Sequence, residues 1–143
     1  MHWRHVAKVV GVLTIALAST MLIPLLVGLF YKDGSARTFV MAIAGTLAGG
    51  AVLIFCGRGD RSDYVSQREG MAIVALGWTL AGLFGALPFY FEGHFPTFTD
   101  AFFESVSGFT TTGASVLTDI EAVPKGILLW RSLIQWLGGM GII

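Results

Sequence analysis

The sequence predicts an all-α integral membrane protein, in which a transmembrane helical hairpin precedes a second unit that inserts a loop between two further helices. Of its 143 residues, 55% are hydrophobic and only 13% are charged, whereas about 25% are charged in an average soluble domain. Three runs, residues 9–31, 38–57 and 70–91, contain no charged residue. At about 1.5 Å of helical rise per residue, each run can cross a hydrocarbon core of about 30 Å.

The predicted hairpin occupies residues 1–57, because only a short polar turn at Asp33-Gly34 separates the first two apolar runs. A polar loop over residues 58–69 then leads to the third run. Basic residues concentrate at the N-terminus and in this loop, and the positive-inside rule assigns such segments to the cytoplasm. These residues are Arg4, Lys8, Arg58, Arg61 and Arg68. We therefore expect both the N-terminus and this loop to be cytoplasmic.

The second unit, residues 70–143, contains a segment that is too short to cross the bilayer twice but carries apolar side chains at helical spacing. Irregular backbone at membrane depth is tolerated only where it is buried in protein or lines a water-filled path. We expect a re-entrant segment there, between two spanning helices. The elements expected, in chain order, are an outer helix 70–91, a short helix 97–108, a loop 109–115 and an inner helix 124–143 that is cut short while still apolar.

The short helix has clear start and stop signals. Thr97 suits the N-cap and Asp100, three residues later, makes an aspartate version of the capping box. Gly108 suits the C-terminal end. Such a helix would point its C-terminus toward the middle of the bilayer, and the negative end of its dipole, worth about half a charge, would favour a cation there.

The loop that follows is the stretch Phe109-Thr110-Thr111-Thr112-Gly113-Ala114-Ser115. Gly113 can adopt backbone angles closed to other residues, so that consecutive carbonyl oxygens can face one axis and replace the hydration shell of an alkali cation. A threonine-rich string by itself is more often a polar surface turn, but its place between a capped short helix and a spanning run favours an ion-selective filter. The candidate ligands are Thr110, Thr111, Thr112, Gly113 and Ala114.

Two charged residues of this unit need explanation. Glu104 lies in the middle of the short helix, where an unpaired charge in the membrane is costly. Its candidate partner is Arg131 near the start of the inner helix, although Arg131 could equally extend to the interface. Gln135 and Gly139 share the face of Arg131 and are expected to pack against the pore unit. Trp130 fits an aromatic belt at the interface.

The stretches 103–115 and 130–143 resemble the first pore repeat of TrkH-type potassium uptake proteins, members of the Trk/Ktr/HKT superfamily of cation transporters. The resemblance implies that residues 70–143 form one membrane-pore-membrane unit and that residues 1–57 are the family's additional N-terminal hairpin. It further implies that Gly113 is the key filter glycine, with potassium bound at Thr111, Thr112 and Gly113. The implied function is potassium uptake through a carbonyl-lined selectivity filter.

Family members fold four such repeats around one potassium pathway, and one repeat supplies oxygen ligands from one side only. The chain is therefore expected to be an inactive fragment of a longer transporter, whose other repeats complete the filter. The resemblance also implies a homodimer, a cytosolic nucleotide-binding regulatory subunit of the TrkA type, and a place among the lipids of the bacterial inner membrane. Conduction as a channel and symport with protons or sodium both stay open.

Other functions have less support. The sequence contains no phosphate-binding glycine loop and no His-Glu-x-x-His string, and its formal net charge of zero argues against nucleic-acid binding. We expect neither an enzyme nor a cofactor, with potassium as the transported substrate. The alternative is a small multi-pass membrane protein with a role in assembly or anchoring and no conduction.

Overall fold

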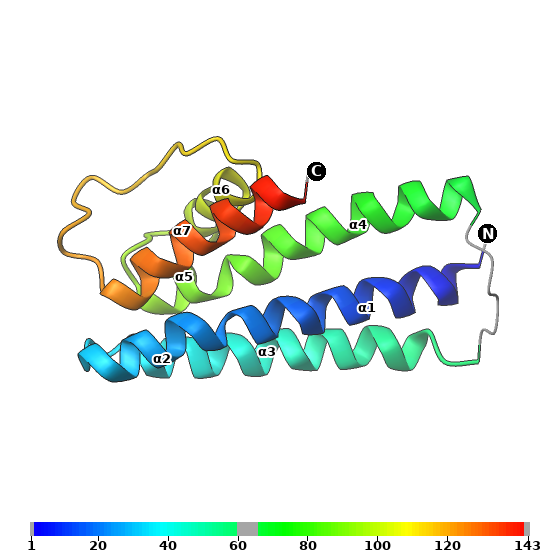
Figure 1. Ribbon diagram of the computed structural model, residues 1–143, viewed down its shortest axis with the longest axis horizontal. Helices are drawn as coiled ribbons and strands as arrows, with labels where there is room; N and C mark the ends of the chain where they lie inside the picture. Colours follow the sequence, from blue (N-terminus) through cyan, green and yellow to red (C-terminus); the bar gives the residue numbers. More distant parts are fainter. Residues whose placement is uncertain (1, 60–65, 142–143) are drawn as a thin grey trace.

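The computed structural model describes residues 2–59 and 66–141, and this part of the chain contains helices and no strand. The predicted all-α class is confirmed. Three segments are long and apolar enough to cross a membrane, and they correspond to α1 with α2, to α3, and to α4 with α5. The helices are α1 (Trp3–Thr20), α2 (Leu22–Tyr31), α3 (Ser35–Cys56), α4 (Gln67–Gly85), α5 (Leu87–Glu92), α6 (Phe98–Phe109) and α7 (Lys125–Met140) (Figure 1).

The first spanning segment is interrupted near Pro24. Within the apolar run 9–31, α1 ends at Thr20 and α2 begins after Met21. Pro24 has no N–H and therefore cannot bond the carbonyl of Thr20, four residues earlier. Together α1 and α2 still form one segment, Trp3–Tyr31, that is long enough to cross a membrane.

The outer helix expected over 70–91 starts at a different residue in the structure. It begins earlier, at Gln67, and it divides at Ala86 into α4 and α5. Pro88 explains the division, because it cannot donate to the carbonyl of Phe84. Glu69 explains the earlier start, because it forms a capping box in the first turn of α4.

Two other expected boundaries differ as well. The loop expected over 58–69 ends earlier, because α4 already begins at Gln67. Residues 60–65 of this loop, Arg61 among them, lie outside the described part. The inner helix expected over 124–143 is α7, which begins at Lys125 and ends at Met140, while residues 142–143 are not described.

Close helix packing depends on glycines. At Gly50, an added Cβ would lie 2.7 Å from the side chain of Ile15 and 3.1 Å from the carbonyl oxygen of Gly11, so α1 and α3 approach almost backbone to backbone. At Gly49, an added Cβ would lie 2.7 Å from a ring carbon of Phe84, which places that face of α3 against α4. The small residues of α3 therefore allow close approach of both neighbouring helices.

The core lies where the hairpin meets α5 and α7, and its large side chains include Phe39, Phe89 and Trp130, all fully buried. Trp130 stacks edge-on against Phe39 and donates from Nε1 to the carbonyl of Gly85 at 3.0 Å. The placement of Trp130 in an interfacial belt was therefore wrong. Its indole N–H bonds a carbonyl at the point where α4 gives way to α5.

Asp33 joins the hairpin to the inner helix. Its carboxylate accepts hydrogen bonds from the hydroxyl of Ser35 at 2.7 Å and from the N–H of Gly126, in the first turn of α7, at 3.1 Å. Burial alone would raise the pKa of Asp33, but the hydrogen bonds from Ser35, Gly126 and Lys125 outweigh it and hold the pKa below its ordinary value. The turn between the first two spanning segments thus helps to position α7.

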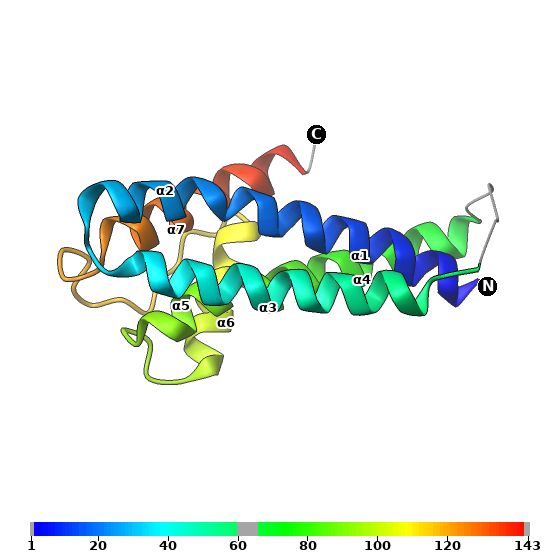
Figure 2. The same ribbon diagram turned by 90° about the horizontal axis from the view of Figure 1, so that it is seen from below.

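The remaining helices, α6 and α7, lie beside the end of the bundle that carries α2 and α5, and α7 ends partway along α4 (Figure 1). Figure 2 shows that α6 runs mostly across the direction of the long helices. Glycines of α4 allow this crossing, because an added Cβ at Gly82 would lie 3.1 Å from Val106 and one at Gly85 would lie 2.6 Å from Phe109.

Candidate functional site

The short helix α6 begins as the sequence predicts. The hydroxyl of Thr97 accepts from the N–H of Asp100 at 3.2 Å, and the carboxylate of Asp100 accepts from the N–H of Thr97 at 3.2 Å, which completes the capping box. The other end differs from the prediction. The helix continues through Gly108 to Phe109, and Gly108 serves close packing instead, since an added Cβ there would lie 2.6 Å from Cγ1 of Ile134.

The loop after α6 turns its amide groups back toward the helix. The N–H of Thr111 donates to Gly108 at 2.9 Å, and the N–H groups of Thr112 and Gly113 donate to Ser107 at 2.9 and 3.4 Å. In a trans peptide the N–H is opposite the carbonyl of the preceding residue. These three bonds therefore direct the carbonyl oxygens of Thr110, Thr111 and Thr112 away from the helix.

Those three carbonyl oxygens are available for a ligand. Thr110, Thr111 and Thr112 are all exposed, and no hydrogen bond within residues 2–59 and 66–141 ends on their carbonyl oxygens. Their hydroxyl groups are partly engaged. The hydroxyl of Thr110 donates to the carbonyl of Val106 at 2.7 Å and lies 2.8 Å from the hydroxyl of Thr112. The loop thus presents a short row of peptide oxygens on its outer side.

Two residues of the loop have left-handed backbone angles. Gly113 has φ 76°, in agreement with the conformational freedom expected there. Thr111 has φ 57°, which is rare for a β-branched residue and costs on the order of 1–3 kcal/mol. No sequence signal predicted this conformation at the candidate ligand Thr111, because threonine has no preference for it. Strain of this kind persists only where the surrounding structure imposes it.

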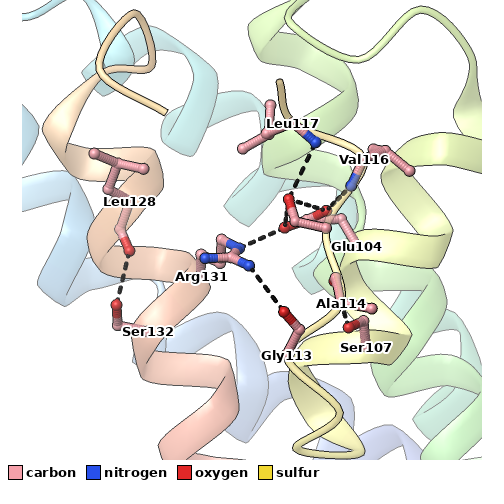
Figure 3. Close-up of polar contacts among 10 residues, drawn as sticks. Glu104, Ser107, Gly113, Ala114, Val116, Leu117, Leu128, Arg131 and Ser132 are labelled. Carbon is pink, nitrogen blue, oxygen red and sulfur yellow. Dashed lines mark hydrogen bonds and ion pairs between the residues drawn. The ribbon is translucent and has the colours of Figure 1, made fainter. Parts of the chain in front are cut away.

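The far side of the loop is attached to α6 and α7. The hydroxyl of Ser107 donates to the carbonyl of Ala114 at 2.6 Å, and Nη2 of Arg131 lies 3.4 Å from the carbonyl oxygen of Gly113 (Figure 3). The Ala114 carbonyl is therefore engaged by its own chain. The longer contact at Gly113 is near the limit for a hydrogen bond and leaves that oxygen a free lone pair.

Glu104 is the centre of this attachment. Its carboxylate is 1% exposed and lies 2.5 Å from Nε of Arg131. It also accepts from the hydroxyl of Ser115 at 3.0 Å and from the N–H of Val116 at 3.2 Å. The structure thus brings together the two residues expected to pair. Ser107, Ser115 and Val116 were not identified from the sequence, because their roles depend on how the loop folds back.

Gln135 and Gly139 lie on the same side of α7 as Arg131 and face the loop. An added Cβ at Gly113 would lie 3.7 Å from Nε2 of Gln135, and one at Gly139 would lie 3.7 Å from Cγ2 of Thr111. The expected packing of this stripe against the pore unit is therefore present.

Comparison with known proteins places this arrangement in a family. The family model TrkH, described as a cation transport protein, matches residues 35–143, more than half of the chain. This chain belongs to the TrkH family. The resemblance inferred from the stretches 103–115 and 130–143 is thereby confirmed.

Similar proteins include curated relatives and a solved structure. The Trk system potassium uptake protein TrkH of Escherichia coli (strain K12) is 48% identical over 144 residues, covering 100% of this TrkH-family chain and 30% of that protein. The protein TrkG of the same strain is 35% identical over 151 residues, covering 99% and 29%. The crystal structure of the potassium transporter TrkH from Vibrio parahaemolyticus matches with a TM-score of 0.90 and 43% identity, covering 99% of this chain and 30% of that one.

This TrkH-family chain therefore spans about 30% of the length of the relatives that it matches.

Proposed function

We propose that this chain supplies one wall of a potassium-selective filter in a Trk-type uptake system. The observation that carries the proposal is the exposed row of peptide oxygens at Thr110, Thr111 and Thr112, which no group of the described chain engages. Carbonyl oxygens arranged in this way replace the water around an alkali cation. The relatives named as potassium uptake proteins support potassium as the ion.

Within this wall, potassium is coordinated by the carbonyl oxygens of Thr111, Thr112 and Gly113, and Thr110 provides the next oxygen toward α6. Ala114 was also a candidate ligand, but the 2.6 Å bond from Ser107 makes its carbonyl the least available of the five. The hydrogen bond from Ser107 directs the Ala114 carbonyl oxygen toward α6. The Gly113 carbonyl oxygen has only a longer contact, at 3.4 Å, with Nη2 of Arg131.

One wall does not surround an ion, and we propose that further pore repeats of a longer parent chain complete the filter. The coverage of about 30% of each relative supports this view. The isolated chain would then be inactive. We further propose a homodimeric parent in the bacterial inner membrane with a cytoplasmic N-terminus, regulated by a cytosolic nucleotide-binding subunit of the TrkA type. Neither enzymatic activity nor a cofactor enters this proposal.

The test compares two glycines with similar backbone angles in the full-length parent. Gly113 has φ 76° and lies in the loop, whereas Gly93 has φ 84° and lies in the turn after α5, and an added Cβ at Gly93 would meet nothing within 4 Å. An L-residue in this region costs about 1–2 kcal/mol at either position. Only Gly113→Ala changes the direction of filter carbonyls, so we expect rubidium uptake by whole cells to fall about tenfold or more, while Gly93→Ala retains it.

The same assay separates the two candidate functions. If the parent has only an assembly or anchoring role, the wild-type protein confers no rubidium uptake on cells that lack their own potassium transporters. If wild-type uptake is present and Gly113→Ala leaves it unchanged, the assignment of the filter to this loop is wrong. Membrane expression of both variants, measured by immunoblot, excludes a loss of protein as the cause.

A further inference from the structure

The inner helix α7 approaches the end of α6 more closely than a side chain would allow. An added Cβ at Gly138 would lie 2.6 Å from the carbonyl carbon of Phe109, 2.8 Å from its Cα, and nearer still to its carbonyl oxygen. No other glycine in residues 2–59 and 66–141 would bring a Cβ so near a backbone atom. Because these neighbours are backbone atoms, no change of rotamer could make room.

Phe109 is the residue from which the filter loop starts. It is the last residue of α6, and the next peptide is fixed by the bond from the N–H of Thr110 to Val106 at 2.9 Å. The depth at which Phe109 sits therefore decides where the row of peptide oxygens begins. Phe109 itself is buried and packs against Gly85 of α4 and Gly138 of α7.

The same helix also holds the far end of the loop. Arg131, almost two turns before Gly138, lies against the Gly113 carbonyl and pairs with Glu104. The helix α7 thus contacts both ends of the loop: the backbone of Gly138 lies against Phe109, and the side chain of Arg131 lies against the carbonyl of Gly113. Between these two points the loop oxygens face away from α6, on the exposed side.

We propose that Gly138 is a positioning residue for ion selectivity: the absence of a side chain there lets α7 set the depth of Phe109, and through it the spacing of the carbonyl oxygens of the loop. This inference rests on the proposed function of the loop. Even one methyl group at this position would displace the backbone of Phe109 by about 1 Å, because the overlap is with main-chain atoms that no rotamer change can move. A shift of that size is comparable with the geometric tolerance of a functional site.

The adjacent residue provides a matched control. Gly139 lies in the same turn of the same helix, but an added Cβ there would lie 3.7 Å from the Cγ2 of Thr111, which is an ordinary van der Waals distance. Gly138→Ala and Gly139→Ala therefore change helix propensity equally and differ only in the overlap with Phe109. A purely structural role for Gly138 would lower the amount or stability of the protein without altering its preference among ions.

The experiment measures the ratio of potassium to sodium uptake by the full-length parent in proteoliposomes, with thermal unfolding in detergent recorded alongside. We expect Gly138→Ala to lower this ratio about tenfold and Gly139→Ala to keep it within about twofold of wild type. Equal ratios for wild type and Gly138→Ala, at whatever rate, would overturn the inference. A wild-type protein without potassium uptake would instead contradict the proposed function.

A second variant covers the case in which Gly138→Ala does not fold. Gly108 faces Ile134 of α7, and an added Cβ there would overlap the flexible end of that side chain instead of backbone. Gly108→Ala should therefore separate α6 from α7 by a smaller distance than Gly138→Ala does. We expect it to lower the ratio of potassium to sodium uptake by about threefold. If folded Gly108→Ala protein keeps the wild-type ratio, the inference is overturned on that variant alone.

Discussion

Removing Arg131 should destabilise the protein strongly, because it leaves a buried carboxylate without its cation. Glu104 is 1% exposed, whereas the side chain of Arg131 is 25% exposed. Breaking a buried ion pair from one side costs about 3–5 kcal/mol. The two remaining donors, Ser115 and Val116, still bond Glu104, so we expect Arg131→Met to lower the free energy of unfolding by about 3 kcal/mol, the lower end of that range.

The partner variant should cost less, and the two effects should not add. In Glu104→Gln the guanidinium of Arg131 keeps contact with solvent and with the Gly113 carbonyl, so the expected loss is about 2 kcal/mol. The double variant buries no unpaired carboxylate and should lose about 3 kcal/mol, which corresponds to a coupling energy of about 2 kcal/mol. Losses that simply add in the double variant would refute the ion pair.

The measurement is denaturant unfolding of the full-length parent in detergent micelles, followed by tryptophan fluorescence. Ser132→Ala is the control, because Ser132 is adjacent to Arg131 and its exposed hydroxyl bonds only the carbonyl of Leu128 at 3.1 Å. Its effect should stay within about 0.5 kcal/mol. A comparable loss in Ser132→Ala would show that the assay reports general damage to α7.

Two further predictions follow from contacts between the hairpin, α4 and α7. Trp130→Phe removes the only indole donor to the buried carbonyl of Gly85 in the described chain, and we expect a loss of about 1–3 kcal/mol by the same unfolding assay, against no loss for Trp3→Phe at an exposed position. Asp33 has a lowered pKa, so its contribution is present above the ordinary value of about 3.9 and is lost as the pH falls through the lowered value. Asp33→Asn should therefore show a smaller drop in thermal unfolding temperature between about pH 5 and pH 3, and an unchanged drop would contradict the contact with Gly126.

Local rules of sequence predicted much of the site. The capping box of Thr97 and Asp100 follows from residue types three positions apart, and it is present with both hydrogen bonds. The left-handed Gly113 follows from the freedom of glycine to take that conformation. Pairing Glu104 with Arg131 required only the argument that a membrane-embedded charge needs a partner.

The features that sequence reasoning missed depend on contacts between distant segments. Asp33 reaches Gly126 across 93 positions of the chain. Gly108 has the residue type of a helix stop, but the side chain of Ile134 decides its role, and α6 continues past it. Thr111 takes a left-handed angle against its own preference, and its side chain lies beside Gly139 of α7. None of these outcomes is encoded in the residues nearest to them.

The most direct test of the central claim is anomalous diffraction from crystals of the full-length parent grown in rubidium. The account predicts an anomalous peak on the exposed side of the loop, within coordinating distance of the carbonyl oxygens of Thr111 and Thr112. A rubidium ion bound elsewhere in the membrane region, with those two oxygens facing no ion, would contradict it.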